Sequence, residues 1–286
     1  MHHLKVFIEL TRLNKPTGIM LLFWPCSWGL AYANSISPNT EIFLNFLVLF
    51  FLGSVLMRSA GCIVNDVIDK DFDKYVERTK KRPIPSGKIS VSMSLIYALI
   101  ICICAFLILI QFNFLTIVLG IGSMFFAFTY PYMKRFTYWP QLFLGLTFNW
   151  GIIMAWTAMN NEISLEILLL YASAIFWTLG YDTIYGAQDM SDDEIIGIKS
   201  TSIKFKKNIK FFVTISYTLT VFLILLLFFN SIGLNLFSGT LLIFFISLAY
   251  QLIKFEEKNP ASCLKIFKFN NFSGLFLFLS ILLINY

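Results

Sequence analysis

The sequence predicts an all-α integral membrane protein with nine transmembrane helices, arranged as two four-helix repeats plus one helix, and with its N-terminus in the cytoplasm. Hydrophobic residues make up 58% of the 286 residues and charged residues only 13%, whereas an average soluble domain has about 25% charged residues. The apolar residues form long runs, and the basic residues fall on alternate connections between them. This composition excludes a cytosolic enzyme, a disordered chain and a nucleic-acid-binding domain, so we expect no nucleic acid partner.

Nine apolar runs are long enough to cross a bilayer as helices, for which about 20 residues are needed. The runs do not alternate polar with apolar residues, as membrane-spanning strands do. In chain order the predicted helices are Thr17–Ala33, Ile42–Val64, Val91–Ile110, Phe112–Met133, Trp139–Met159, Ile163–Tyr185, Phe211–Asn230, Ile232–Ile253 and Phe269–Tyr286.

An internal repeat is indicated by the acidic residues, most of which gather in two clusters. The clusters follow the second and the sixth predicted helices, an offset of four helices. This offset indicates an old duplication of a four-helix unit, of a kind common in membrane proteins. We therefore expect residues 1–286 to form a single transmembrane domain.

The basic residues predict the orientation in the membrane. Of the 22 lysines and arginines, Arg58 alone lies inside a predicted helix. All others lie in the N-terminal arm or in the connections after the second, fourth, sixth and eighth helices, and such an excess marks the cytoplasmic side. We expect a multi-pass protein of the bacterial inner membrane, with both acidic clusters at the cytoplasmic face.

The first acidic cluster contains Asn65, Asp66, Asp69 and Asp73. If the second helix continues through it, the three aspartates stand at i, i+3 and i+7 and share one face. A single aspartate at a helix end is usually only solvated. The regular spacing instead favours a shared ligand.

The second acidic cluster follows the sixth helix with a similar spacing. Asp182, Tyr185, Asp189 and Asp193 stand at i, i+3, i+7 and i+11, again on one face of a continuous helix. Mg²⁺ prefers one or two carboxylates together with phosphate oxygens of a substrate. Two such clusters at one membrane face therefore predict a Mg²⁺ site for a phosphorylated substrate.

Basic residues flank both clusters and predict phosphate contacts. Arg78, Lys80 and Arg82 follow the first cluster, and Lys199 follows the second. Arginine offers paired donors to phosphate and lysine a point charge, so we expect a diphosphate site. For any one lysine, ordinary positive charge of a cytoplasmic loop is the alternative. The end of the fourth helix, with Tyr130 and nearby Lys134, is expected to close the same cavity.

Arg58 is the one basic residue within an apolar helix, two turns before Asn65. Ionisable residues inside membranes are usually functional, and this position predicts an anion receptor deeper than the metals. A structural ion pair with an acid on a neighbouring helix is the alternative.

Four stretches of the chain resemble the intramembrane aromatic prenyltransferases, the UbiA superfamily. The stretch from Asn65 to Gly87 is similar to the first signature of that family, and the stretch from Tyr181 to Thr201 to its second signature. The N-terminal stretch from Arg12 to Leu30 and the segment from Arg58 to Cys62 resemble it as well. The second signature looks most like that of the hydroxybenzoate branch, and the resemblance covers nearly the whole chain.

The resemblance implies transfer of a polyprenyl group from polyprenyl diphosphate to the ring carbon ortho to the hydroxyl of 4-hydroxybenzoate, as in ubiquinone biosynthesis. It implies two Mg²⁺ ions and four catalytic aspartates. Asn65, Asp66, Asp69 and Asp73 would bind one ion and Asp182, Asp189 and Asp193 the other, with Asp66, Asp69, Asp189 and Asp193 catalytic. Arg58, Asn65, Arg78, Lys80, Arg82, Tyr130, Lys134, Tyr185 and Lys199 would bind substrates. A different acceptor, of menaquinone, haem O or chlorophyll type, and a secondary transporter are the alternatives.

Overall fold

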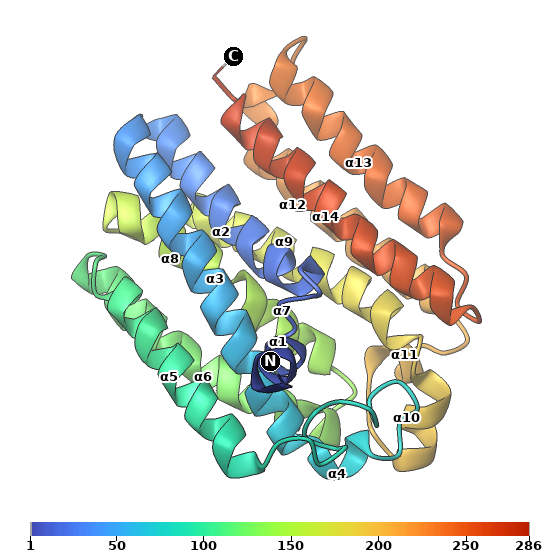
Figure 1. Cartoon of the computed structure of the whole chain (residues 1–286). Coiled ribbons are helices and arrows are strands. Elements are labelled where there is room, and N and C mark those ends of the chain that lie inside the picture. Colours follow the sequence, from blue (N-terminus) through green and yellow to red (C-terminus); the bar gives the residue numbers. More distant parts are fainter. Residues whose placement is uncertain (1, 286) are drawn as a thin grey trace.

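The computed structural model describes residues 2–285, and every regular element in that range is a helix. The helices are α1 (His2–Thr11), α2 (Thr17–Ile36), α3 (Thr40–Ile68), α4 (Lys70–Asp73), α5 (Val91–Leu109), α6 (Phe114–Phe136), α7 (Pro140–Asn149), α8 (Gly151–Asn160), α9 (Leu165–Gly186), α10 (Met190–Ile196), α11 (Thr201–Lys204), α12 (Ile209–Leu227), η1 (Phe229–Ser231), α13 (Leu236–Lys254) and α14 (Pro260–Leu282). The long helices form one bundle, and the short helices α4, α10 and α11 gather at one of its ends (Figure 1).

Seven helices within residues 2–285 are long and apolar enough to cross a membrane. They are α3, α5, α6, the pair α7–α8, α9, α12 and α13. The two other predicted spans coincide with α2 and α14, which have 20 and 23 residues. Both are long enough to span, but α14 carries Lys265 and Lys268, and neither is among the seven.

The last helix begins earlier than the sequence predicts. Pro260 occupies its first turn, and the side chain of Asn259 accepts a hydrogen bond from the Ser262 amide. Proline and an asparagine cap together favour a helix start. As a result Lys265 and Lys268 lie on α14 and not in a connection.

Both acidic stripes depart from the predicted continuous helices. Helix α3 ends at Ile68 with Asp69 as its C-cap, and α4 follows at Lys70. Helix α9 ends at Gly186, and Asp189 is the N-cap residue of α10. The prediction of one helix face through each cluster is therefore wrong, and tertiary contacts arrange the carboxylates instead.

Glycines allow the closest helix contacts in the core. A Cβ atom on Gly29 of α2 would lie 2.5 Å from the carbonyl oxygen of Ile152 in α8. On the other side of α2, the Trp28 indole donates to the Gly274 carbonyl of α14 at 2.9 Å. These contacts hold α2 between α8 and α14.

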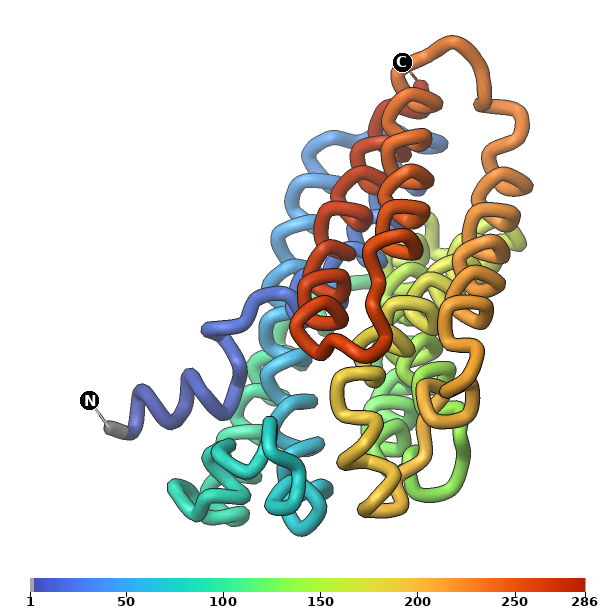
Figure 2. Tube along the Cα trace, turned by 90° about the vertical axis from the view of Figure 1, so that its right-hand side faces the viewer, coloured from blue at the N-terminus to red at the C-terminus, as the bar shows by residue number. Residues whose placement is uncertain are grey.

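Helix α1 is the one long element of the N-terminal arm, where the sequence analysis predicted no helix. It projects sideways from the bundle (Figure 2). Arg12 follows it with a left-handed φ of 56°, so the chain turns sharply there into α2.

Candidate active site

A cavity of about 1340 Å³ opens at the end of the bundle where α4 and α10 lie. Most of the predicted site residues line it. They are Arg58, Asn65, Asp69, Asp73, Arg78, Arg82, Tyr130, Lys134, Asp182, Tyr185, Asp189, Asp193 and Lys199. Asp66 and Lys80 do not line the cavity. Lys80 pairs with Glu77 on the exposed surface, so its predicted role in substrate binding is not supported.

The first acidic cluster is held by ion pairs. Asp66 is buried and pairs with Arg12 and, at 3.0 Å, with Arg82. Arg82 also contacts Asp73 at 2.8 Å, which brings the carboxylates of α3 and α4 together across the helix break. Asp69 is likewise buried and contacts the Lys134 ammonium of α6 at 2.5 Å.

Arg78 joins the first cluster's loop to the second cluster. Its guanidinium contacts the Asp189 carboxylate at 2.5 Å and donates to the Tyr185 hydroxyl at 3.0 Å. It also lies 5.3 Å from the centre of the Tyr185 ring. The two signatures, far apart in sequence, therefore form one site.

The donor set fits a hard divalent cation such as Mg²⁺, which takes oxygen ligands. The Oδ1 atom of Asp69 is buried and accepts no hydrogen bond, although the Arg135 guanidinium lies 3.7 Å from it. Within residues 2–285, however, no three acidic, histidine or cysteine side chains converge on one point. The predicted ligand sets stay predictions.

Burial shifts two of these carboxyl groups. Desolvation, and then the neighbouring charge of Asp189, raise the pKa of Asp193 to about 7. Desolvation also raises the pKa of Asp69, against the opposing effect of Lys134. At the cavity mouth, desolvation and then Arg12, Arg78 and other cations lower the pKa of Lys15. Several positively charged side chains therefore lie close together at the cavity mouth, next to the carboxyl groups.

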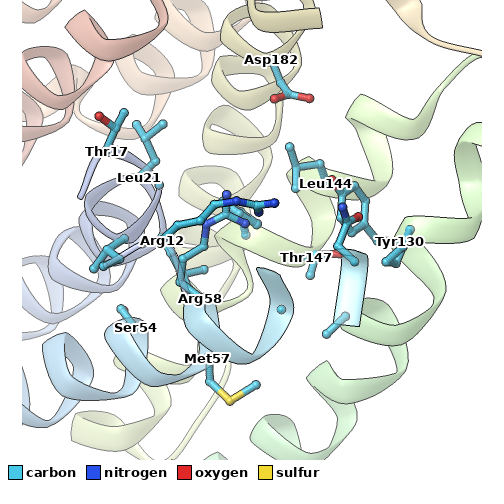
Figure 3. Close-up of a pocket in the computed structure, with 18 of the residues that line it drawn as sticks. Arg12, Thr17, Leu21, Ser54, Met57, Arg58, Tyr130, Leu144, Thr147 and Asp182 are labelled. Atoms are coloured by element: carbon cyan, nitrogen blue, oxygen red, sulfur yellow. The ribbon is translucent and has the colours of Figure 1, made fainter. Parts of the chain in front are cut away.

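Arg58 lies deeper in the cavity, on α3. Its guanidinium lies 5.3 Å from the centre of the Phe148 ring, and a Cβ on Gly18 would lie 2.6 Å from its Nε. In the described part of the chain it forms no ion pair within 4.0 Å. Asp182 points into the same cavity opposite it (Figure 3). The charges of Arg58 and Asp182 interact across the cavity without an ion pair within 4.0 Å, so the choice between an anion receptor and a structural ion pair stays a prediction.

Arg12 is a site residue that the sequence analysis assigned only to the cytoplasmic arm. Its side chain extends into the cavity beside Arg58 (Figure 3) and pairs with Asp66. The signal was its place at the start of the N-terminal stretch that resembles the family. Its charge alone could not distinguish it from a topological arginine.

The loop that carries the second cluster is anchored by polar contacts that the sequence analysis also missed. The Lys199 amide donates to the Lys134 carbonyl at 2.8 Å. The Gln141 side chain accepts from the Thr201 amide at 3.0 Å, and the Thr183 and Thr201 hydroxyls lie 2.6 Å apart. These bonds hold the loop against α6, α7 and α9.

Comparisons with known proteins agree on one family. The model of the UbiA prenyltransferase family matches residues 22–280. The chain is 40% identical to 4-hydroxybenzoate octaprenyltransferase of Psychromonas ingrahamii over 98% of this chain and 96% of that protein. It is 39% identical to the mitochondrial 4-hydroxybenzoate polyprenyltransferase of Bos taurus over 99% of this chain and 76% of that protein.

A solved structure shares the fold. A UbiA homologue from Archaeoglobus fulgidus bound to DMAPP and Mg²⁺ superposes with a TM-score of 0.73 at 16% identity, over 96% of this chain and 98% of that one. At this identity the likeness establishes the fold, an all-helical membrane fold.

Proposed function

Because the chain belongs to the UbiA prenyltransferase family, we propose that it transfers a polyprenyl group to the ring carbon ortho to the hydroxyl of 4-hydroxybenzoate. Polyprenyl diphosphate is the donor, and diphosphate is released. The observation that carries the acceptor is Arg58, a guanidinium in the cavity without an ion-pair partner among the described residues. A benzoate carboxylate would complete a bidentate pair there.

Basic side chains at the mouth bind the diphosphate. Arg78, Arg82 and Lys134 face the cavity beside the carboxylates, and Arg12 and Lys199 add to the same positive region. They orient the donor and stabilise the negative charge that grows on the leaving group.

The acidic residues of the same rim would hold Mg²⁺, which would neutralise charge on the leaving diphosphate. Asn65, Asp69 and Asp73, which line the cavity, would serve one ion, and Asp189 and Asp193 the other. Asp66 pairs with Arg12 and Arg82 and does not line the cavity, so its place in the first set rests on family resemblance alone. Asp182 lies on α9, beyond the helix break, so its place in the second set rests on family resemblance alone. The oxygen donors that line the rim, and the Oδ1 of Asp69, which accepts no hydrogen bond, support this assignment.

The reaction replaces the hydrogen on one ring carbon with the prenyl group and releases diphosphate and a proton. The bond between C1 of the prenyl chain and the diphosphate oxygen breaks, and its electron pair leaves with the diphosphate. The ring carbon ortho to the hydroxyl bonds to C1 and then loses its hydrogen as a proton. A carboxylate accepts one proton, either from that carbon after attack or from the phenol before attack. In the second case the ring proton afterwards restores the hydroxyl. Arg58 holds the ring in line with C1, where orientation matters most.

The protein lies in the membrane with its catalytic end facing the cytoplasm. We propose nine spans, with α2 and α14 added to the seven apolar helices, and two four-helix repeats. The long apolar tail stays in lipid, because each buried CH₂ contributes about 0.8 kcal/mol, while diphosphate and metal stay near water. The basic connections at the end with α4 and α10 support this orientation in the bacterial inner membrane.

Purified protein tests this function directly. It is incubated with a polyprenyl diphosphate, 4-hydroxybenzoate and Mg²⁺, and the product mass is measured. We expect prenylated 4-hydroxybenzoate, and none after EDTA. A product only with a different phenol, or turnover that persists in EDTA, would overturn the acceptor or the metal requirement.

A further inference from the structure

The cavity continues from the acidic rim into the interior of the bundle along one face of α3. Asn65, Gly61, Met57, Gly53 and Phe50 all line it. They recur every three or four positions and therefore share one helix face. At the rise of 1.5 Å per residue, this face is about 22 Å long. Helix α3 thus runs beside the cavity from its polar mouth to its inner end.

The part of the cavity beyond Arg58 is mostly apolar. Phe106 and Leu109 of α5, Met124 of α6 and Met154 of α8 line it together with α3. Two serines also line this part, but the Ser123 hydroxyl donates to the Gly120 carbonyl at 2.6 Å and the Ser54 hydroxyl lies 4.0 Å from the Cys26 thiol. A wall of this kind suits a hydrocarbon chain, because burial of apolar surface away from water is favourable. We take this arm to hold the prenyl tail, which rests on the proposed function.

The inner end of the arm is closed by aromatic packing. Phe112, between α5 and α6, is 8% exposed. Its ring centre lies 5.1 Å from that of Phe46 and 4.9 Å from that of Phe50. Nearby, a Cβ on Gly120 would lie 2.5 Å from a methyl carbon of Leu109, so no side chain would fit there without displacing its neighbours.

Gly53 occupies a different environment, although it lines the same arm. A Cβ built on Gly53 would meet nothing within 4 Å. The open space beside Gly53 is therefore the cavity itself. It lies between the ring site at Arg58 and the closed end at Phe50 and Phe112.

We propose that Gly53 is a specificity-determining residue for the length of the prenyl tail. A tail that reaches from the reacting carbon beyond Gly53 must pass through the space that a side chain at this position would fill. A short tail ends before it. Whatever path the remainder of a long tail takes, substitution of Gly53 should separate long donors from short ones.

The test compares Gly53→Leu with wild type on geranyl, farnesyl, geranylgeranyl and octaprenyl diphosphate, at saturating 4-hydroxybenzoate and Mg²⁺. We expect kcat/KM for the shortest donor that wild type uses to change little. For the longest donors it should fall by about 10-fold to 100-fold, as when extra methylenes must fit into filled apolar space. The KM for 4-hydroxybenzoate should stay unchanged.

Two variants serve as controls. Gly122→Leu lies on α6, where a Cβ also meets nothing within 4 Å, and this residue is not among those lining the cavity in the described chain. It should leave the preference for tail length unchanged. Gly61→Leu fills the cavity between Arg58 and Asn65, so it should impair all donors alike.

The outcomes separate the two proposals. Equal loss on all donors with Gly53→Leu, or no loss on any, would overturn the role of Gly53. Absence of turnover in wild type with every donor would instead refute the proposed function. If Gly53→Leu does not assemble in detergent, Gly53→Ala and Gly53→Val should give the same order of donors with smaller changes, and a flat series would count against the proposal.

Discussion

At the scale of single residues, Arg58 makes the acceptor preference testable. Arg58→Ala should raise the KM for 4-hydroxybenzoate by about 10-fold to 150-fold, because a charge-assisted pair contributes roughly 1.5–3 kcal/mol. The KM for polyprenyl diphosphate should hardly change, and Arg58→Lys should recover only part of the loss. A neutral phenol of similar size should be a poor substrate and insensitive to the change. If Arg58→Ala raised the KM for both substrates equally, Arg58 would instead have a role in diphosphate binding or in the structure of the protein.

The carboxylates of the rim make a second residue-scale prediction. Asp69→Asn and Asp189→Asn should each lower turnover by more than about 100-fold. Residues that only hydrogen-bond to a metal ligand cost up to about 100-fold when they are changed, and a ligand itself should cost more. Membrane insertion should be unaffected. Asp71→Asn is the matched control, since Asp71 pairs with Lys74 on the surface. Rates near wild type for Asp69→Asn and Asp189→Asn in saturating Mg²⁺ would refute the metal site.

The raised pKa of Asp193 predicts that the apparent KM for Mg²⁺ depends on pH. Burial raises the pKa of Asp193 to about 7, and a carboxyl group must lose its proton to bind a metal. The apparent KM for Mg²⁺ should therefore rise by about tenfold from pH 8 to pH 6, as this group becomes protonated. Asp193→Asn should remove that dependence, whereas Asp192→Asn should keep it. A KM for Mg²⁺ that is flat across this range would contradict the assignment.

At the scale of helices, the contact between α2 and α8 sets the position of the segment that carries Arg12 into the cavity. Gly29→Ala should lower the midpoint of thermal unfolding in detergent, because the new Cβ would overlap the Ile152 carbonyl. Overpacking of this kind costs about 1–3 kcal/mol. Gly239→Ala on α13 is the control, since its Cβ meets nothing within 4 Å and alanine favours a helix. If the two variants unfold at the same temperature, the close contact between α2 and α8 does not contribute to stability.

A buried polar network has a comparable role among α9, α12, α13 and α14. The Trp177 indole donates to Asn270 at 2.9 Å, and Asn270 donates to Gln251 at 2.9 Å. The Tyr217 hydroxyl donates to the same Gln251 oxygen at 2.7 Å. Because each of these groups has a partner, the network specifies how the helices pack. Helix α9, which carries Asp182 and Tyr185, is thereby held in place.

At the scale of the whole molecule, the membrane topology is open to a direct test. A reporter fused to the C-terminus should lie in the periplasm, and one inserted near Asn208 should lie in the cytoplasm. The distribution of basic residues over alternate connections is the reason. The opposite location at either position would refute the arrangement of nine spans, including α2 and α14.

Membership in the family also decides between the two classes of function that the sequence left open. A transporter would place its ionisable residues near the middle of the membrane. Here most of them meet at one end of the bundle, beside α4 and α10, and the relatives are prenyltransferases. The chain is therefore an enzyme that uses its membrane position to reach an apolar donor.

The sequence alone determined the helical membrane class, the approximate positions of the long helices and most of the charged residues that line the cavity. The physical reason is that a bilayer imposes long apolar helices and sorts basic loops to one side, so local composition carries this information. The same holds for Asp69, Asp189 and Arg58, whose residue types and positions in the chain are unusual for a membrane protein.

Only the tertiary structure decided which charges meet. Arg12 and Asp66 are 54 positions apart, and Arg78 and Asp189 are 111 apart. Their contacts depend on how α2, α3 and α9 pack, which no local pattern records. The helix breaks after Ile68 and Gly186 have the same origin, because the chain there follows the ion pairs and loop anchors of the site. The open space beside Gly53 likewise exists only because α5, α6 and α8 surround α3 without filling it.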